Sequence, residues 1–369
     1  MTLEQRLAAV REGMRARGLD AVIALHDGTH FIETPNPVQM LTGFKSLGAA
    51  AVVVTANGED PILVVTPAWD AERARERCEK TRVVAADDLV EGLVSALAAR
   101  GRSLGIVGLP ATPWALSGRL MEVLPQAASV DDWVYALGAI KTEDEIRDGR
   151  EATRIAEVTY QHMIDIVRPG ISEDELALEL KWYSRTLGAE DNFLLLCAGS
   201  HNRAVQPSTG RRMQAGDIVL AEITPSCRGQ LAQICRTIVL GPASAELKRK
   251  YDLVVRAMNE GIRAASPGVP MSAVCRAINA VLEAEGYGEF CYPPHIRRRG
   301  HGLGFAAISP GDVSLDNETI LAPGMIFMIH PNQYLPETGY LLCGEPVLMT
   351  PTGAEPLTRR HAALAEIPL

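Results

Sequence analysis

Three polar side chains interrupt two apolar runs in the middle of the chain, and their types are those of a chemical site. The apolar runs at residues 218–221 and 234–240 predict the two strands of a hairpin. Glu222 ends the first run, while Gln233 and Arg236 lie around the start of the second. A carboxylate buried among apolar strands has to be paired or put to use, because burying an unpaired charge is costly. The hairpin is therefore predicted to bring inward-facing polar groups together.

Two histidines further along the chain are candidates for acid–base chemistry. His301 stands between two glycines in the sequence GHGLG, and glycine lets the backbone come close to a ligand. His330 follows the apolar run MIFMI and precedes a proline. Because an imidazole titrates near neutral pH, either ring can accept or donate a proton in a reaction. The alternative for His330 is a hydrogen-bonded histidine in the core.

The two polar residues of the hairpin each have a structural alternative. Glu222 is interpreted as a general base or an anchor for a substrate cation, and alternatively as the ion-pair partner of Arg236 or Arg228. Gln233 either hydrogen-bonds a substrate or bridges the strands. A polar turn between the strands is predicted at residues 224–229.

The elements around these residues form two predicted domains. Apolar spacing predicts a helix over residues 3–18, ended by Gly18. Strand and helix patterns then alternate, which predicts an α/β first domain over residues 1–135 and a second domain over residues 136–369. In the second domain, Ser172 and the glutamate three residues later predict the capping box of a helix.

Composition and charge exclude several classes of protein. The 369 residues carry a net charge of −9, so there is no overall basic field for nucleic acid. Seven cysteines without a CxxC pair suit a reducing compartment. The charged N-terminal segment is unlike a signal peptide, and no apolar run reaches the length that spans a bilayer. We therefore expect a cytoplasmic protein that acts on a small molecule and binds neither nucleic acid nor membranes.

Seven segments of the second domain occur in an order that resembles a known family. They are KTEDEI, RPGISEDEL, AGDIVL, CRTIVLG, GHGLG, LAPGMIFMIHP and GEPVLMTPTG. In this order they resemble the creatinase and Xaa-Pro aminopeptidase family, and MLTGF followed by paired apolar strands resembles its N-terminal domain. The resemblance implies an α/β (α+β) fold, with a pita-bread C-terminal domain after a smaller α/β creatinase-like domain. It also implies a homodimer in which the partner's N-terminal domain can line the cleft.

The resemblance also implies a set of metal ligands. Metal-dependent members of the family hold two divalent ions with Asp, Asp, His, Glu and Glu, and the corresponding positions here are Glu222, Gln233, His301, His330 and Gly344. Only the histidine is kept unchanged. Because two adjacent cations need several carboxylates, we expect no cofactor. The alternative is a single divalent ion on Glu222, His301 and His330.

Creatinase and ectoine hydrolase resemble this chain in having the fold without the full metal set. We therefore predict a metal-independent, creatinase-like hydrolase of a non-peptide C–N bond in a small polar amide, amidine or cyclic amidine. His301 or His330 would take a proton from water, while Glu222 orients the base and Gln233 contacts the substrate. The alternatives are a mononuclear metalloenzyme, an Xaa-Pro-type peptidase of the same fold, and a catalytically silent binding module.

A few further residues are candidates for the site. His201 lies on the loop AGSHN, near the position where the resemblance to creatinase implies an acid–base histidine. The candidates for substrate binding are Arg297, Glu345 and His30. The two arginines after Arg297 are expected at the surface or at a subunit contact.

Overall fold

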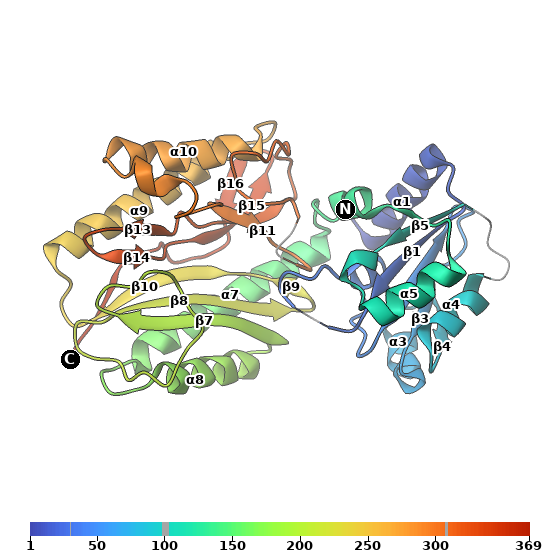
Figure 1. Ribbon diagram of the computed structural model, residues 1–369, viewed down its shortest axis with the longest axis horizontal. Helices are drawn as coiled ribbons and strands as arrows, with labels where there is room; N and C mark the ends of the chain where they lie inside the picture. The colour runs from blue at the N-terminus through green and yellow to red at the C-terminus, as the bar shows by residue number, and fades with distance from the viewer. Residues whose placement is uncertain (30, 98–102, 307–308) are drawn as a thin grey trace. The chain divides into compact units, whose positions relative to one another are not determined.

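The computed structural model describes residues 1–29, 31–97, 103–306 and 309–369. Within these ranges the chain forms two compact units that divide between Glu143 and Asp144, and a short segment that includes Phe305 belongs to the first unit. Figure 1 shows the helices and strands of both units. The predicted boundary after residue 135 lies inside a helix, α6 (Asp131–Leu137).

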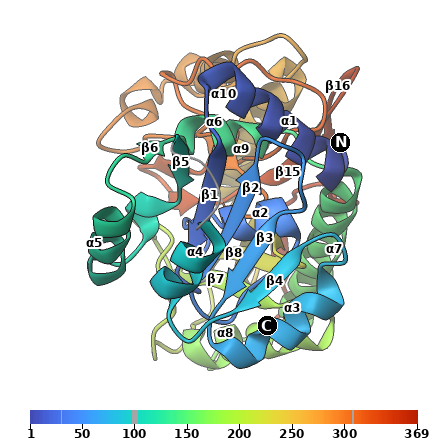
Figure 2. The ribbon, with the colours of Figure 1, turned by 90° about the vertical axis from the view of Figure 1, so that its right-hand side faces the viewer.

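The first unit is a six-stranded mixed sheet with helices packed on it. The strand order is β4-β3-β2-β1-β5-β6, in which β1 runs antiparallel to β2 and parallel to β5 (Figure 2). The strands are β1 (Ala21–His26), β2 (Ala50–Thr55), β3 (Ile62–Val65), β4 (Arg82–Ala85), β5 (Leu104–Val107) and β6 (Ala128–Ser129). The α-helices are α1 (Leu3–Arg17), α2 (Pro37–Thr42), α3 (Ala71–Arg77), α4 (Leu89–Leu97), α5 (Trp114–Val123) and α6.

Both faces of the sheet are buried along β1, β2 and β3, which explains why these strands read as continuous apolar runs. Along β1, Val22 and Ala24 belong to one core cluster, while Ala21 and Ile23 belong to a second cluster. Successive side chains of a strand point to opposite faces, so each cluster lies on one face of the sheet. The predicted first helix is confirmed as α1, and Gly18 follows it in the left-handed conformation at φ 65°.

The second unit has two main sheets, with orders β17-β10-β8-β7 and β11-β12-β15-β16. The helices are α7 (Glu143–Ile166), α8 (Glu173–Thr186), α9 (Ala245–Ala264) and α10 (Met271–Ala284). The strands are β7 (Asp191–Gly199), β8 (Ile218–Cys227), β9 (Gln230–Leu231), β10 (Ile234–Leu240), β11 (Gly300–Gly302), β12 (Ile326–Ile329), β13 (Gln333–Leu335), β14 (Gly339–Leu341), β15 (Glu345–Thr350), β16 (Gly353–Pro356) and β17 (Ala365–Ile367).

Within this unit the sheets lie between two pairs of helices. Helices α7 and α8 cover the sheet of β7, β8 and β10, whereas α9 and α10 lie on the side of β11 to β16 (Figure 1). The predicted capping box of α8 is confirmed, because the Ser172 hydroxyl accepts from the Glu175 backbone N–H and the Glu175 carboxylate accepts from the Ser172 N–H. No helix in the described part of the chain is long and apolar enough to cross a membrane.

The predicted hairpin is formed by β8 and β10, which pair antiparallel. The predicted turn at 224–229 contains the observed one but begins too early, since β8 continues to Cys227. Arg228 and Gly229 turn the chain with φ of 46° and 81°. Two successive residues at positive φ suit the right-handed twist of paired strands. After this turn the short strand β9 pairs with the end of β8, and the chain then enters β10.

Candidate active site

The alternation of side chains along β8 decides where Glu222 points. Val219, Ala221 and Ile223 belong to the core cluster with α7 and α8. Because neighbouring side chains of a strand lie on opposite faces, Glu222 points away from these helices. It is partly buried there, opposite Cys235 of β10 in the register of the two strands.

Arg236 lies on the other face of the hairpin, so the prediction that it points inward with Glu222 was wrong. Its guanidinium stacks over Tyr160 of α7 at 5.6 Å and forms a buried ion pair with Glu345 at 2.9 Å. The Thr358 hydroxyl donates a second hydrogen bond to Glu345, at 2.5 Å. Glu345, a candidate for substrate binding, therefore has both carboxylate oxygens occupied inside the protein.

Glu222 and Gln233 do lie together. The Gln233 Nε2 atom donates to Glu222 Oε2 at 3.4 Å, and Asn332 Nδ2 donates to Glu222 Oε1 at 3.3 Å. The Cys235 thiol is 3.8 Å from the same Oε1 atom. All three donors are neutral. The alternative partners of Glu222 are engaged elsewhere, since Arg236 pairs with Glu345 and Arg228 pairs with Asp148.

Gln233 joins the carboxylate to His301. Its Oε1 atom is 2.9 Å from His301 Nε2, and the other ring nitrogen, Nδ1, is 2.9 Å from the carbonyl oxygen of Gly302. Both contacts are hydrogen bonds at the same time only when both ring nitrogens carry protons, because both partners are carbonyl oxygens. The His330 ring lies edge-on to His301, with centroids 5.1 Å apart. Glu222, Gln233, His301 and His330 thus form one continuous cluster.

Burial sets the charges of this cluster. It raises the pKa of Glu222 to about 7, and the Cys235 hydrogen bond and the charge of Arg298 offset only part of that rise. Burial also moves the pKa of His330 well below its usual value, and the neighbouring His301 and Arg298 lower it further. His330 is therefore neutral at physiological pH. Its Nδ1 atom is buried and has no hydrogen-bond partner in the ranges that the structure describes.

The remaining predicted residues lie in other settings. His201 is exposed, and its Nε2 atom is 2.9 Å from the carbonyl oxygen of Pro336. Arg297 is exposed and lines a cavity. His30 lies outside the described residues. Arg299, expected at the surface, is in fact only 1% exposed.

Two contributors to the site were missed in the sequence. Asn332 is 2% exposed and hydrogen-bonds Glu222, and a polar amide just after the apolar run and the proline at 331 was the available signal. Arg298 was predicted at a surface or subunit contact, and its side chain is indeed partly exposed. It pairs with Asp312 at 3.1 Å, and its charge also acts on Glu222 and His330.

The family of the chain follows from two matches. Residues 6–140 match the creatinase/prolidase N-terminal domain, and residues 148–351 match metallopeptidase family M24. The chain belongs to metallopeptidase family M24. The pita-bread fold with a creatinase-like N-terminal domain is thereby confirmed.

Full-length relatives of this M24 chain include Xaa-Pro dipeptidases. The Xaa-Pro dipeptidase of Pyrococcus furiosus is 26% identical over 98% of this chain and 100% of its own length. The crystal structure of the prolidase from Pyrococcus horikoshii OT3 superimposes with a TM-score of 0.85 at 25% identity, covering 98% of this chain and 99% of the prolidase. An uncharacterized peptidase of Bacillus subtilis is 30% identical over 64% of this chain and 66% of its own length.

These findings correct two predictions. The predicted metal-independent hydrolase of a non-peptide C–N bond is contradicted, because the full-length relatives are dipeptidases, which act on peptide bonds. The prediction that no cofactor is used is contradicted as well, because the family is one of metallopeptidases. Both errors come from giving four substituted positions more weight than the similarity of the whole chain.

The side chains of this site nevertheless do not fit a pair of divalent ions. The described residues contain no group of three or more His, Cys, Asp or Glu side chains placed to hold a metal ion. Gln233 is neutral, and its oxygen already contacts His301. A Cβ atom added at Gly344 would lie 2.6 Å from the Cβ of His330, so a side chain there would require its neighbours to shift. We therefore assign no chemical step to a metal.

Proposed function

We propose that the protein is an Xaa-Pro-type peptidase that hydrolyses the C–N bond before a proline in a small peptide. The observation that carries the proposal is the match to Xaa-Pro dipeptidases along the whole length of both chains. A full-length match includes both domains, so it supports a shared substrate class more strongly than a match to the catalytic domain alone. We retain the homodimer as a prediction.

In this proposal Glu222 is the general base. Water adds to the peptide carbonyl carbon, and its proton passes to the Glu222 carboxylate. The C–N bond then breaks as the same proton passes to the proline nitrogen, which leaves an amino acid and a free imino acid. A carboxyl with a pKa of about 7 suits both directions of transfer, because it is ionised and protonated in comparable amounts near neutral pH.

The histidines have supporting roles in the same proposal. His330 is neutral, and its buried Nδ1 atom has no partner in the described part of the chain. In this proposal a polar group of the bound substrate supplies that hydrogen bond. His301 is held in place by Gln233 and by the carbonyl of Gly302. A doubly protonated His301 provides positive charge near the carbonyl oxygen that becomes negative during the reaction.

The second candidate function is a catalytically silent module that binds a peptide without cleaving it. One observation favours it, namely that the described side chains do not form a metal-holding group. A chain that has lost catalysis can retain the fold and its binding surface. The two candidates differ in turnover, which a direct assay measures.

The test is an assay of the purified protein with Ala-Pro, Ala-Ala and Pro-Ala, with and without added Mn²⁺ or Zn²⁺. We expect release of proline from Ala-Pro alone. Glu222→Gln should lower kcat by roughly 100-fold or more, because general acid–base catalysis contributes about that much. The control Glu355→Gln makes the same change at an exposed residue of β16 and should keep full activity. Binding of Ala-Pro without release of proline would instead support the silent module.

A further inference from the structure

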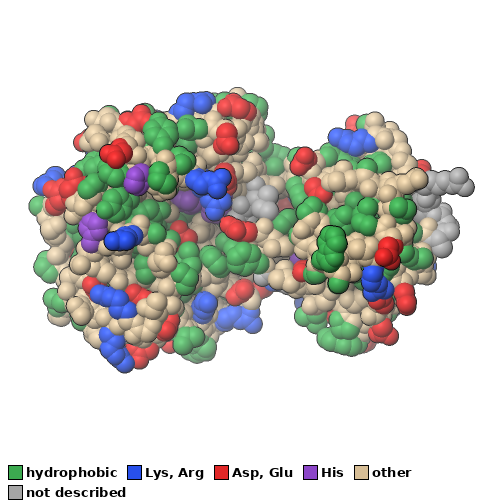
Figure 3. Space-filling model, in the orientation of Figure 1, with side chains coloured by type: hydrophobic (Ala, Val, Ile, Leu, Met, Phe, Trp, Pro, Cys, Tyr) green, Lys and Arg blue, Asp and Glu red, His purple; other side chains and the backbone are tan. Residues whose placement is uncertain are grey.

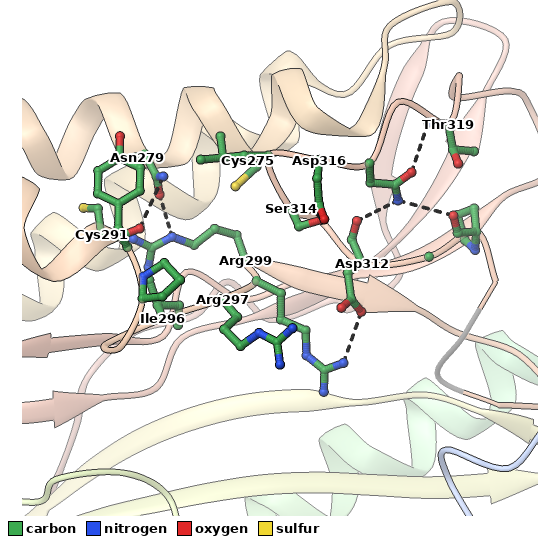
Figure 4. Close-up of a pocket in the computed structure, with 17 residues that line it drawn as sticks. Cys275, Asn279, Cys291, Ile296, Arg297, Arg299, Asp312, Ser314, Asp316 and Thr319 are labelled. Atoms are coloured by element: carbon green, nitrogen blue, oxygen red, sulfur yellow. Dashed lines mark hydrogen bonds and ion pairs between the residues drawn. The ribbon is translucent and has the colours of Figure 1, made fainter.

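The second unit contains a cavity of about 660 Å³ that has Arg298 in common with the surroundings of the proposed peptidase site. It lies between α10 and the two segments at residues 291–299 and 310–319 (Figure 4). Its volume is in the range of pockets that bind small molecules. Glu222, His301 and His330 do not line it.

Arg299 supplies a buried positive charge to the wall of this cavity. Its guanidinium bonds only neutral acceptors: Asn279 Oδ1 at 2.7 Å, Gln333 Oε1 at 2.9 Å and the carbonyl oxygens of residues 331 and 332. The Nη2 atom is buried and has no hydrogen-bond partner in the described ranges. A buried cation among neutral partners is only partly compensated, so an anion close to it is favoured.

Two further arginines extend along the opening of the cavity. Arg297 is exposed and forms no ion pair with any residue that the structure describes, and Figure 4 shows it extending away from Arg299. Arg298 pairs with Asp312 at 3.1 Å. Two carboxylates line the cavity, and the second, Asp316, accepts a hydrogen bond from Ser314 at 2.5 Å. Three guanidinium groups against two carboxylates leave the lining with a positive charge.

We propose that this cavity binds an anionic group, a carboxylate or a phosphate, of a small molecule. Arg297 and Arg298 would hold its oxygens through forked hydrogen bonds, near the buried charge of Arg299. Guanidinium groups suit this role because their donors match the geometry of carboxylate and phosphate oxygens. The positive charge is confined to this cavity, since side chains of both signs are interspersed on the face shown in Figure 3. The proposal does not depend on peptidase activity.

Calorimetric titration of the full chain with inorganic phosphate, and separately with succinate, tests the proposal at low ionic strength. We expect saturable binding of at least one of the two anions. Arg297→Gln should weaken it at least about tenfold, the usual size of a lost charge-assisted hydrogen bond. Arg297 is exposed, so this change should leave folding intact. Arg297→Lys keeps the positive charge but lacks the paired N–H donors of the guanidinium group, so this variant should bind the anion with intermediate affinity. Arg154→Gln, the same change on α7, should bind like the wild type.

Each outcome is decisive. Binding of phosphate alone identifies a phosphate-bearing ligand, and binding of succinate alone identifies a carboxylate. Binding of both that is lost in Arg297→Gln supports recognition of the anionic charge. If neither anion binds, or if Arg297→Gln and Arg154→Gln bind equally well, the proposal is overturned. These results are independent of Ala-Pro cleavage, so the proposed function can fail without affecting them.

Discussion

The positions of Gly344 and His330 are sterically coupled. A Cβ atom built on Gly344 would lie 2.5 Å from Met328 Cε, 2.6 Å from the Cβ of His330 and 3.1 Å from its Cα. Met328 can move the end of its flexible side chain, but the His330 Cβ is attached to the backbone, so residue 330 or residue 344 has to shift. The glycine and the histidine therefore form a pair, and each depends on the identity of the other.

This coupling predicts the result of a double-mutant cycle. Gly344→Ala should destabilise the protein by about 1–3 kcal/mol, the usual cost of overpacking. In a His330→Gly background the same change should cost about 0.5–3 kcal/mol less, because the clashing Cβ has been removed. Urea denaturation measures both values. Gly118→Ala is the control, since a Cβ there meets nothing within 4 Å. Equal costs in the two backgrounds would disprove the coupling.

The ion pair between Arg236 and Glu345 predicts a structural effect of substitution. Both side chains are buried, at 2% and 3% exposure. Glu345→Ala should therefore lower the free energy of unfolding by about 3–5 kcal/mol, because the arginine charge stays behind without its partner. Glu355→Ala, which breaks the exposed pair with Arg150, should cost less than about 1 kcal/mol. An unchanged unfolding energy with a raised KM would instead make Glu345 a substrate-binding residue.

The raised pKa of Glu222 predicts how stability depends on pH. The pKa of this carboxyl is near the ordinary 4.5 in the unfolded chain and about 7 in the folded one, so between these values the folded state binds more protons. Its contribution is complete below the lower value and is lost as the pH rises through the upper one. Wild-type stability should therefore fall by roughly 1–3 kcal/mol relative to Glu222→Gln over this range.

Urea titrations of both proteins at a series of pH values measure this difference. Glu355→Gln serves as the control, because it makes the same change at an exposed side chain outside the site. A difference between wild type and Glu222→Gln that does not change with pH would show that Glu222 keeps an ordinary pKa.

Features with a local cause could be predicted from the sequence. The capping box at Ser172 needs only residues three positions apart, and the end of α1 at Gly18 needs only one left-handed residue. The hairpin strands were found because apolar runs on both sides of a turn pair with each other. The cluster of Glu222 and Gln233 follows from the same hairpin, since the two residues lie close along the chain.

Features that depend on register or distant packing could not be predicted. Arg236 was placed beside Glu222, but a difference of one position along β10 puts it on the opposite face, where it meets Glu345 more than 100 residues away. Asn332 reaches Glu222 from a separate sheet region, so no local pattern reports the contact. Arg299 belongs to a run of arginines that predicts a solvated surface. In the structure it is only 1% exposed, and neutral acceptors such as Asn279 hydrogen-bond its guanidinium.

Hydrolysis of Ala-Pro by the wild type and by Glu222→Gln, with divalent metal ions supplied, tests whether the protein is an Xaa-Pro-type peptidase with Glu222 as its base. We expect the wild type to release free proline and the variant to do so at least roughly 100-fold more slowly. Absence of proline release from the folded wild type would contradict the proposed peptidase activity. Equal rates in wild type and variant would contradict the role of Glu222.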